Sequence, residues 1–136
     1  VDKGANLDLQ ATDGTTALLI ASQNGFADVV RLLIEKGVRL DLMRYDGISA
    51  LMRATQNGYI EIVRLLVDDG AQIDLQGING FTALIVACMN EYTEIVKLLL
   101  EKGANTDLKD NAGKMALDYA ENSKIKSLLD NYSKIH

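Results

Sequence analysis

A sequence pattern recurs every 33 residues from one end of the chain to the other. Small and apolar residues hold fixed places in it, such as the columns Gly14, Gly47, Gly80, Gly113 and Ala21, Ala54, Ala87, Ala120. Several independent columns at one spacing do not arise by chance. A repeat of this length predicts a solenoid, in which each unit buries its apolar face by stacking on its neighbours.

Each unit contains two helical patterns joined by a turn. At about 100° per residue, the segment 16–24 has one face with Leu18, Ala21 and Ser22 and an opposite face with Ile20, Gln23 and Asn24. Gly25 and Gly58 follow, where a helix end favours a left-handed residue. In the second helix we expect Val29, Leu32 and Leu33 to point inward and Asp28, Arg31 and Glu35 to point outward.

The third copy breaks the glycine column, because Glu91 stands in the place of Gly25 and Gly58. A left-handed glutamate is strained, since its Cβ crowds the carbonyl group. We expect Glu91 to accept this conformation, so that Glu91→Gly would stabilise the array. The alternative is a rearranged turn in which Asn90 carries the left-handed conformation.

The copies "DGTTALLIASQNGFADVVRLLIEKG" and "NGFTALIVACMNEYTEIVKLLLEKG" are similar to the ankyrin repeat, and this resemblance covers the whole chain. It implies an all-α solenoid of stacked antiparallel helix pairs with β-turn or hairpin loops. Thr16, Ser49 and Thr82 are then the predicted helix N-caps. The family's usual proline is replaced by Ala17, Ala50, Ala83 and Ala116, and its usual histidine by Leu19, Met52, Ile85 and Asp118. These departures indicate a divergent branch of bacterial type.

We expect a single domain over residues 1–136, and the 33-residue frame divides it. The predicted units are the tail of a preceding repeat at 1–10, full repeats at 11–43, 44–76 and 77–109, and a shortened capping repeat at 110–136. The segment 1–4 matches 34–37, so the chain is expected to start inside a repeat of a longer array. Leu128 follows Ala120 by 8 positions whereas Leu32 follows Ala21 by 11, which predicts a last inter-helix turn shorter by three residues.

Composition excludes several classes of function. A net charge of -5 and a pI of about 4.8 argue against a nucleic-acid or anionic-membrane surface, which needs clustered Lys and Arg. The longest apolar run, 83–89, is far short of the roughly 20 residues that span a bilayer. With one cysteine there is no internal disulfide, and we expect a cytoplasmic, intracellular location. A bacterial protein secreted into a host cell would share this reducing environment.

The residues needed for catalysis are scarce. The one histidine is His136, so no catalytic triad of Ser or Cys with His is expected. Cys88 shares its column with Ser22 and Thr55 and is interpreted as a packing residue. Four aspartates at one column are expected to hydrogen-bond within their own loops rather than converge on a cation: Asp8, Asp41, Asp74 and Asp107. We therefore predict no enzyme activity, no cofactor and no metal.

The resemblance implies that a partner lies in the groove formed by the loop tips and the first helices. The copies differ most there, as the column of Thr15, Ile48, Phe81 and Lys114 shows. The predicted partner-binding residues are Met43, Tyr45, Asp46, Ile48, Arg53, Gln56, Ile78, Asn79, Phe81, Val86, Met89, Lys114 and Tyr119. Several of them are apolar, and Arg53 could anchor a carboxylate or stack on an aromatic ring. The prediction is a monomeric, non-catalytic module that binds another protein.

Three alternatives remain at this point. Phe81 and Ile48 could simply pack on adjacent loops. The chain could be a structural spacer of a longer array that binds nothing itself. It could also be an engineered binder, although the irregular stretch "CMNEYTEIV" and the shortened last turn speak against a consensus design.

Overall fold

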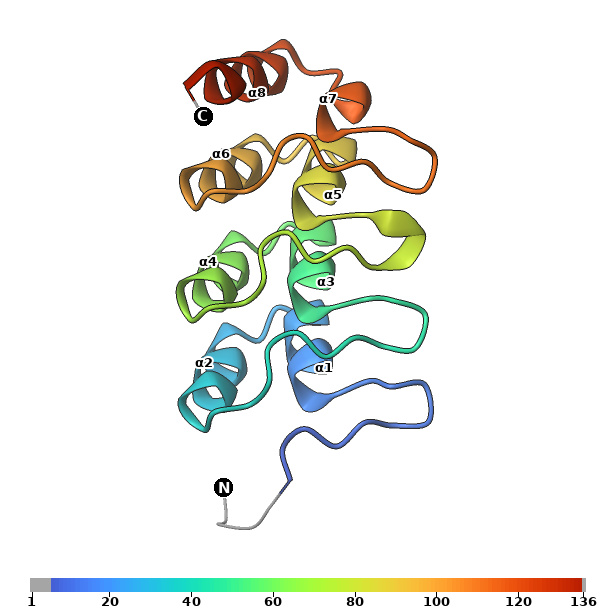
Figure 1. Ribbon diagram of the computed structural model, residues 1–136. Coiled ribbons are helices and arrows are strands. Elements are labelled where there is room, and N and C mark those ends of the chain that lie inside the picture. The colour runs from blue at the N-terminus through green and yellow to red at the C-terminus, as the bar shows by residue number, and fades with distance from the viewer. Residues whose placement is uncertain (1–5, 136) are drawn as a thin grey trace.

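The computed structural model describes residues 6–135, and it shows helices stacked in two parallel columns (Figure 1). The first column holds α1 (Ala17–Gln23), α3 (Ala50–Gln56), α5 (Ala83–Met89) and α7 (Ala116–Tyr119). The second column holds α2 (Ala27–Glu35), α4 (Ile60–Asp68), α6 (Thr93–Glu101) and α8 (Ser123–Ile135). A single turn of 3-10 helix, η1 (Ile78–Gly80), lies in a loop tip, and residues 6–135 contain no β-strand. The all-helical solenoid predicted from the repeat is confirmed.

Side-chain hydroxyls start the first three helices of the first column, as predicted. The hydroxyl oxygens of Thr16, Ser49 and Thr82 each accept a hydrogen bond from the backbone N–H three residues on, at 3.1 to 3.2 Å. This bond satisfies one of the N–H groups that a helix leaves without an internal partner. The fourth copy has Met115 in this column, and there the Asp118 carboxylate accepts the Met115 N–H at 2.8 Å instead. Asp118 therefore has a structural role.

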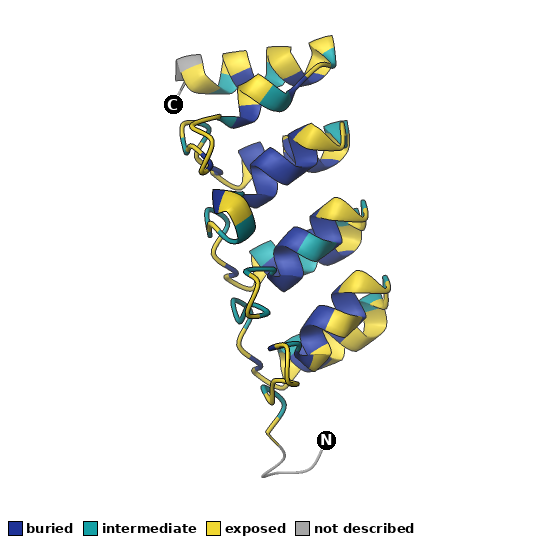
Figure 2. Ribbon diagram, turned by 90° about the vertical axis from the view of Figure 1, so that its right-hand side faces the viewer, coloured by how far each residue is buried: buried dark blue, intermediate teal, exposed yellow. Residues whose placement is uncertain are grey.

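The core lies between the two columns and between successive repeats. Figure 2 shows that buried residues are concentrated in the helices and that the loops are mostly exposed or half-buried. The predicted inner face of α1, with Leu18, Ala21 and Ser22, is buried, and Ile20 on the opposite face is exposed. Small residues such as Ala54 and Ala87 are fully enclosed, so neighbouring helices approach closely. Burial of this apolar surface is the main force that holds the stack together.

The predicted inner face of α2 is wrong in part. Val30 and Leu33 are buried, but Val29 is 44% exposed and Leu32 is 45% exposed. The Val29 column is buried in α4 and α6, where Ile62 and Ile95 each have a helix pair on both sides. That column faces the preceding repeat, so its burial depends on a neighbour and not on the helix pair to which it belongs.

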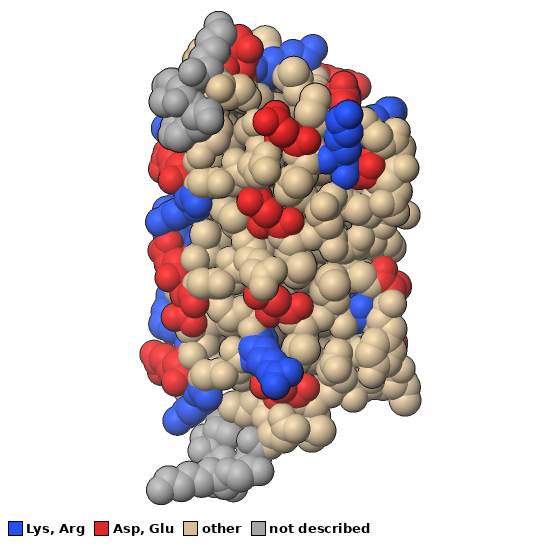
Figure 3. Space-filling model, viewed as in Figure 1, with Lys and Arg blue, Asp and Glu red and all other residues tan. Residues whose placement is uncertain are grey.

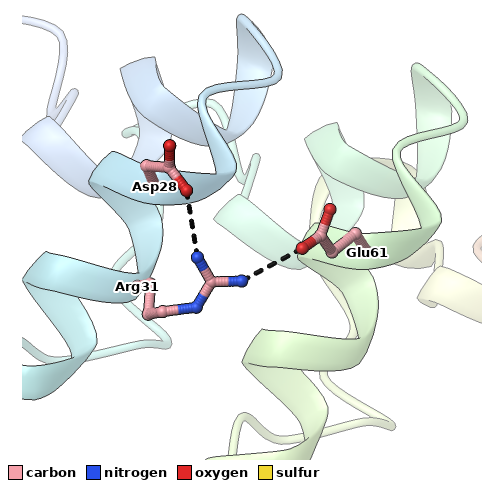
Figure 4. Close-up of polar contacts among 3 residues, drawn as sticks. All are labelled: Asp28, Arg31 and Glu61. Carbon is pink, nitrogen blue, oxygen red and sulfur yellow. Dashed lines mark hydrogen bonds and ion pairs between the residues drawn. The ribbon is translucent and has the colours of Figure 1, made fainter.

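Charged side chains also link neighbouring repeats. Arg31 on α2 bonds to Asp28 of its own helix and to Glu61 of α4, both at 3.0 Å (Figure 4). Exposed pairs of this kind each stabilise by about 0.2–1 kcal/mol. Acidic side chains also recur along the face where the linker loops run (Figure 3).

The expectation that the four aspartates bond within their own loops is wrong for the first three and holds only for Asp107, which accepts from Thr106 Oγ1 at 3.4 Å. Asp8, Asp41 and Asp74 each accept the backbone N–H of the next repeat's linker, at Arg39, Gln72 and Asn105, over 2.8 to 3.0 Å. The reason is that the stacking brings each aspartate opposite the next linker, which has unpaired N–H groups. The column therefore joins consecutive repeats, and no group of three metal-ligating side chains occurs among the described residues.

The prediction that the last inter-helix turn is shortened is wrong in its location, because the turn 120–122 is as long as the turn 24–26 and the first helix is shortened instead. α7 has 4 residues where α1, α3 and α5 have 7, which accounts for the three missing residues. α8 still buries Ile125 and Leu129 against the stack, in the manner of a cap. The predictions that concern residues 1–4 and His136 lie outside the described residues. Within those residues, no helix has the length and apolar character needed to cross a membrane.

Candidate functional site

An open cavity of about 280 Å³ lies between α3, α5 and the loop tip that precedes α5. We call it the apolar cavity, and its lining is Ile48, Met52, Arg53, Gln56, Ile78, Asn79, Phe81, Val86, Met89 and Asn90. Most of the predicted partner-binding residues are therefore brought together in one place. The cavity lies where the second and third copies differ from the others in sequence.

The first wall of the apolar cavity is α3. Arg53 and Gln56 lie three residues apart on this helix, and Arg53 Nη1 donates to Gln56 Oε1 at 2.7 Å. Arg53 Nε is buried and has no hydrogen-bond partner in the structure. Met52 stands one residue earlier and is buried, with its side chain in the lining. This wall therefore combines an apolar surface with a cation whose donors are only partly used.

The second wall is the end of α5. Met89 is 43% exposed, and Asn90 donates its side-chain N–H to the Val86 carbonyl oxygen at 2.9 Å. Val86 was predicted as an exposed residue, but it is only 7% exposed. The correction has a steric cause, because α5 packs between α3 and α7 and this short side chain does not reach past its neighbours. Val86 thus forms the base of the cavity and Met89 its edge.

The loop tip with η1 closes the cavity from above, and Gly77 determines its path. A Cβ built on Gly77 would overlap the Gly47 carbonyl oxygen and lie 2.7 Å from Met52 Sδ. Ile78 N donates to Gly47 O at 2.7 Å. The two equivalent contacts between loop tips run from Tyr45 N to Asp13 O and from Asn111 N to Asn79 O. In the 33-residue frame both of those acceptors correspond to position 46, so the acceptor Gly47 lies one residue later. This shifted bond brings Ile78 over the cavity.

Phe81 contacts the next repeat as well as the cavity. Its ring meets the Tyr119 ring edge to face, with centroids 6.3 Å apart and planes at 87°. Lys114 Nζ lies 5.6 Å from the same Tyr119 ring, and the Tyr119 hydroxyl donates to Asp110. This hydrogen bond lowers the pKa of the Asp110 carboxyl and raises the pKa of Tyr119. Phe81 is half-buried, so the packing that we considered as an alternative contributes to its position.

The remaining predicted residues, Met43, Tyr45, Asp46, Lys114 and Tyr119, do not line the apolar cavity. Tyr45 is 72% exposed on the neighbouring loop tip. Asp46 forms an ion pair with Arg44 at 3.1 Å, which engages its carboxylate. These positions surround the cavity as a rim or lie beside it.

Met52 and Gly77 line or shape the cavity, and neither was among the predicted site residues. Met52 occupies the column where the family usually has histidine, and the apolar residues Leu19 and Ile85 in the same column gave no sign that it lines a cavity. For Gly77 the sequence does contain a signal. It is the one glycine in the three full copies that lies outside the repeated glycine columns. An unrepeated glycine in a repeat protein marks a local departure of the backbone.

A larger polar depression of about 460 Å³ lies where α8 meets two linker loops. Its polar groups bond to each other, for example Thr106 Oγ1 to Ser133 Oγ at 3.1 Å and Asn105 N to Asp74 Oδ1 at 2.8 Å. We place the candidate site at the apolar cavity, because it combines exposed apolar surface with the partly used donors of Arg53, whereas the polar depression has mainly polar lining residues, some of which bond to one another.

Cys88 has no catalytic setting. The thiol is fully buried on α5, and burial raises its pKa to about 12, so it stays protonated at neutral pH. A thiol nucleophile needs the thiolate and an adjacent base. Cys88 therefore acts as a small apolar side chain in the core, as the sequence predicted.

Comparison with known proteins agrees with this architecture. A family model described as ankyrin repeats (3 copies) matches residues 1–77, and another described as ankyrin repeats (many copies) matches residues 66–120. No curated protein matches the chain. Ankyrin repeats are generally protein–protein interaction modules and are typically non-enzymatic. The chain belongs to the ankyrin-repeat family.

Proposed function

We propose that this chain is a monomeric, non-catalytic module that binds another protein through the groove of its loop tips and first helices, with the apolar cavity at its centre. The observation that carries the proposal is the cavity itself, in which exposed apolar atoms of Met89 and Ile48 stand beside the polar donors of Arg53. Apolar anchors next to a few polar groups are typical of the centres of protein interfaces.

The cavity is open to solvent, which favours a protein partner over a small molecule. Pockets for drug-sized ligands are about 300–1,000 Å³ and bury most of the ligand. A cavity of about 280 Å³ that is open to solvent instead suits one or two side chains of a partner. The surrounding loop tips, including the exposed Tyr45, add surface for the rest of that partner.

The frame around the cavity supports a fixed binding surface. Each loop tip closes a turn by a backbone hydrogen bond of 2.8 to 2.9 Å, such as Arg44 N to Ile48 O. Successive tips are joined by further backbone bonds, such as Tyr45 N to Asp13 O at 2.9 Å. A surface that is already ordered loses less conformational entropy on binding.

A second candidate function is a spacer in a longer array, without a partner of its own. The edge-to-face contact of Phe81 with Tyr119 favours it, because an aromatic side chain that packs within the stack is less available to a partner.

Matched variants distinguish the two functions. Met89 in the cavity and Leu32 on α2 are almost equally exposed, at 43% and 45%. Short random peptides displayed on phage would be selected on the wild-type chain, and the binders measured by fluorescence anisotropy. We expect Met89→Gln to weaken binding at least about fivefold and Leu32→Gln to leave it unchanged, since interface energy concentrates in a few central residues. Binders that are insensitive to Met89→Gln, or the absence of any enriched binder, would favour the spacer.

A further inference from the structure

Arg53 differs from Arg31 and Arg44 in the groups to which its guanidinium bonds. Arg31 bonds to two carboxylates, and Arg44 pairs with Asp46. Arg53 is bonded to a neutral amide, that of Gln56, and no ion pair with an acidic residue is recorded for it among the described residues. The Nε atoms of Arg44 and Arg53 are both buried without an acceptor, so the difference between the two lies in their terminal nitrogens. Arg53 Nη1 bonds to Gln56 and Arg53 Nη2 has no acceptor among the described residues, so the guanidinium retains donors for a partner.

The surroundings of Arg53 strengthen its attraction for an anion. The walls next to it are the apolar side chains of Ile48, Met52 and Val86. A charge pair that forms against an apolar wall is less screened by water than one on an open surface. A guanidinium also matches a carboxylate through two parallel N–H bonds, which a neutral amide acceptor does not allow.

The source of the carboxylate follows from the state of the backbone. Sites that hold a chain-terminal carboxylate generally do so with several free backbone N–H groups. At the cavity Ile78 N, Phe81 N and Asn90 N each donate to a carbonyl oxygen of the protein at 2.7 to 3.1 Å, and the N–H groups of Ile48 and Asn79, which do not, lie on different loop tips. The cavity therefore lacks a run of several free N–H groups, and its cationic donor is the side chain of Arg53. This arrangement suits the side chain of an aspartate or glutamate within a peptide segment.

We infer that the partner segment carries an aspartate or glutamate within two residues of a bulky apolar side chain. The apolar side chain fills the cavity between Ile48, Val86 and Met89, and the carboxylate bonds to Arg53. This inference rests on the proposed function, because it specifies the partner of the same site.

The test uses random peptides displayed on phage, in one library with the peptide internal and in another with a free carboxyl terminus. Selections on the wild-type chain are expected to enrich Asp or Glu close to Leu, Ile, Met or Phe in the internal library. Selections on Arg53→Met should lose the acidic residue and keep the apolar one. Arg64→Met is the matched control, since Arg64 is an exposed arginine on α4 outside the cavity.

The quantitative arm uses a synthetic peptide from the internal library and its Asp→Asn or Glu→Gln counterpart. We expect the neutral peptide to bind the wild-type chain about tenfold more weakly, and the two peptides to bind Arg53→Met alike. Circular dichroism checks that each variant is folded. If Arg53→Met is unfolded, Arg53→Gln takes its place, and Arg53→Lys should restore part of the preference.

The outcomes separate the inference from the proposed function. Peptides that bind at the cavity, as shown by loss of binding to Met89→Gln, but that have no acidic preference would overturn the inference and leave the proposed function standing. Enrichment only with a free carboxyl terminus would also overturn it. If no enriched peptide depends on Met89, the proposed function fails as well.

Discussion

The side chain of Glu91 accepts a hydrogen bond from the backbone N–H of Asn122, with Oε1 and N 3.0 Å apart, although the two residues are 31 positions apart in sequence. The same oxygen accepts the N–H of Glu121 at 3.0 Å. These N–H groups immediately precede α8, where a helix start leaves donors without internal partners. Glu91 also has φ 59°, in the left-handed region where the earlier copies have Gly25 and Gly58. Glu91 thus combines backbone strain with a cap for the shortened last repeat.

The cap changes the expected effect of Glu91→Gly. Relief of strain favours glycine by about 0.5–1 kcal/mol. Loss of the carboxylate removes an acceptor shared by two N–H groups, which costs about 1–2 kcal/mol. We now expect Glu91→Gly to be less stable than the parent by about 0.5–1 kcal/mol, measured by equilibrium urea denaturation.

Two further substitutions separate the strain from the cap. Glu91→Ala keeps the strain and loses the cap, so it should be the least stable variant. Glu91→Gln keeps an acceptor oxygen and should lie closest to the parent. A Glu91→Gly variant that is more stable than the parent would show that the cap contributes little and that the original expectation from sequence holds.

The elements that sequence predicted well are those set by local chemistry. The N-caps at Thr16 and Ser49, the glycine turns and the left-handed Glu91 depend on residues close in sequence, and all are present. Whether a residue of the Val29 column is buried depends on the preceding repeat, and the acceptor role of Asp41 depends on the following one. A single copy of the repeat does not contain that information.

The candidate site shows the same division. Sequence variation between copies indicated the apolar cavity, because positions that the framework does not require are free to differ. The depth of the cavity depends on contacts between different repeats, which the sequence of a single repeat does not indicate. Val86 is buried by its position between two helices, and Gly77 bends the loop tip through a contact with Gly47.

Gly77→Ala should destabilise the chain and change the cavity. The new Cβ would overlap the Gly47 carbonyl oxygen, so the loop tip has to move away and the bond from Ile78 N to Gly47 O weakens. Overpacking of this kind costs about 1–3 kcal/mol. Thermal unfolding gives the stability, and NMR chemical shifts of the Met52 and Met89 methyl groups report the cavity.

Gly103→Ala is the control for Gly77→Ala. Gly103 has φ 92° and no heavy atom within 4 Å of a built Cβ, so alanine there adds backbone strain without a collision. It should lower stability by about 1 kcal/mol and leave the methionine shifts in place. Equal disturbance of the cavity by both variants would contradict the role given to Gly77.

Tyr119→Phe should remove a pH-dependent part of the stability. The Tyr119 hydroxyl lowers the pKa of Asp110 in the folded state, so the bond stabilises the fold above the ordinary pKa of aspartate. This contribution disappears as the pH falls through the lowered pKa. Thermal unfolding should therefore place Tyr119→Phe below the parent at pH 7, with the difference shrinking in acid. A difference that is constant with pH would rule out the carboxylate as the partner that matters.

Met43→Gln should stabilise the loop tips. Gln10 and Gln76 stand in the same column, and each donates its side-chain N–H to two carbonyl oxygens, one in its own loop and one in the next, at 2.8 to 3.2 Å. Methionine at position 43 has no N–H to donate, so the equivalent carbonyl groups of Gly47 and Gln76 lack this bridge. Each net hydrogen bond contributes about 0.5–1.5 kcal/mol, and the bond that Gly47 already accepts from Ile78 reduces the gain.

We therefore expect Met43→Gln to raise the free energy of unfolding by about 0.5–1 kcal/mol in urea denaturation. Gln76→Met is the matched reverse change and should lower it by a similar amount, since it deletes a bridge that the structure contains. If Gln76→Met destabilises while Met43→Gln has no effect, the shifted backbone bond to Gly47 leaves no room for a second donor. If neither substitution changes stability, the glutamine bridges do not hold the loop tips together, and the rigidity of the groove has to come from the backbone bonds alone.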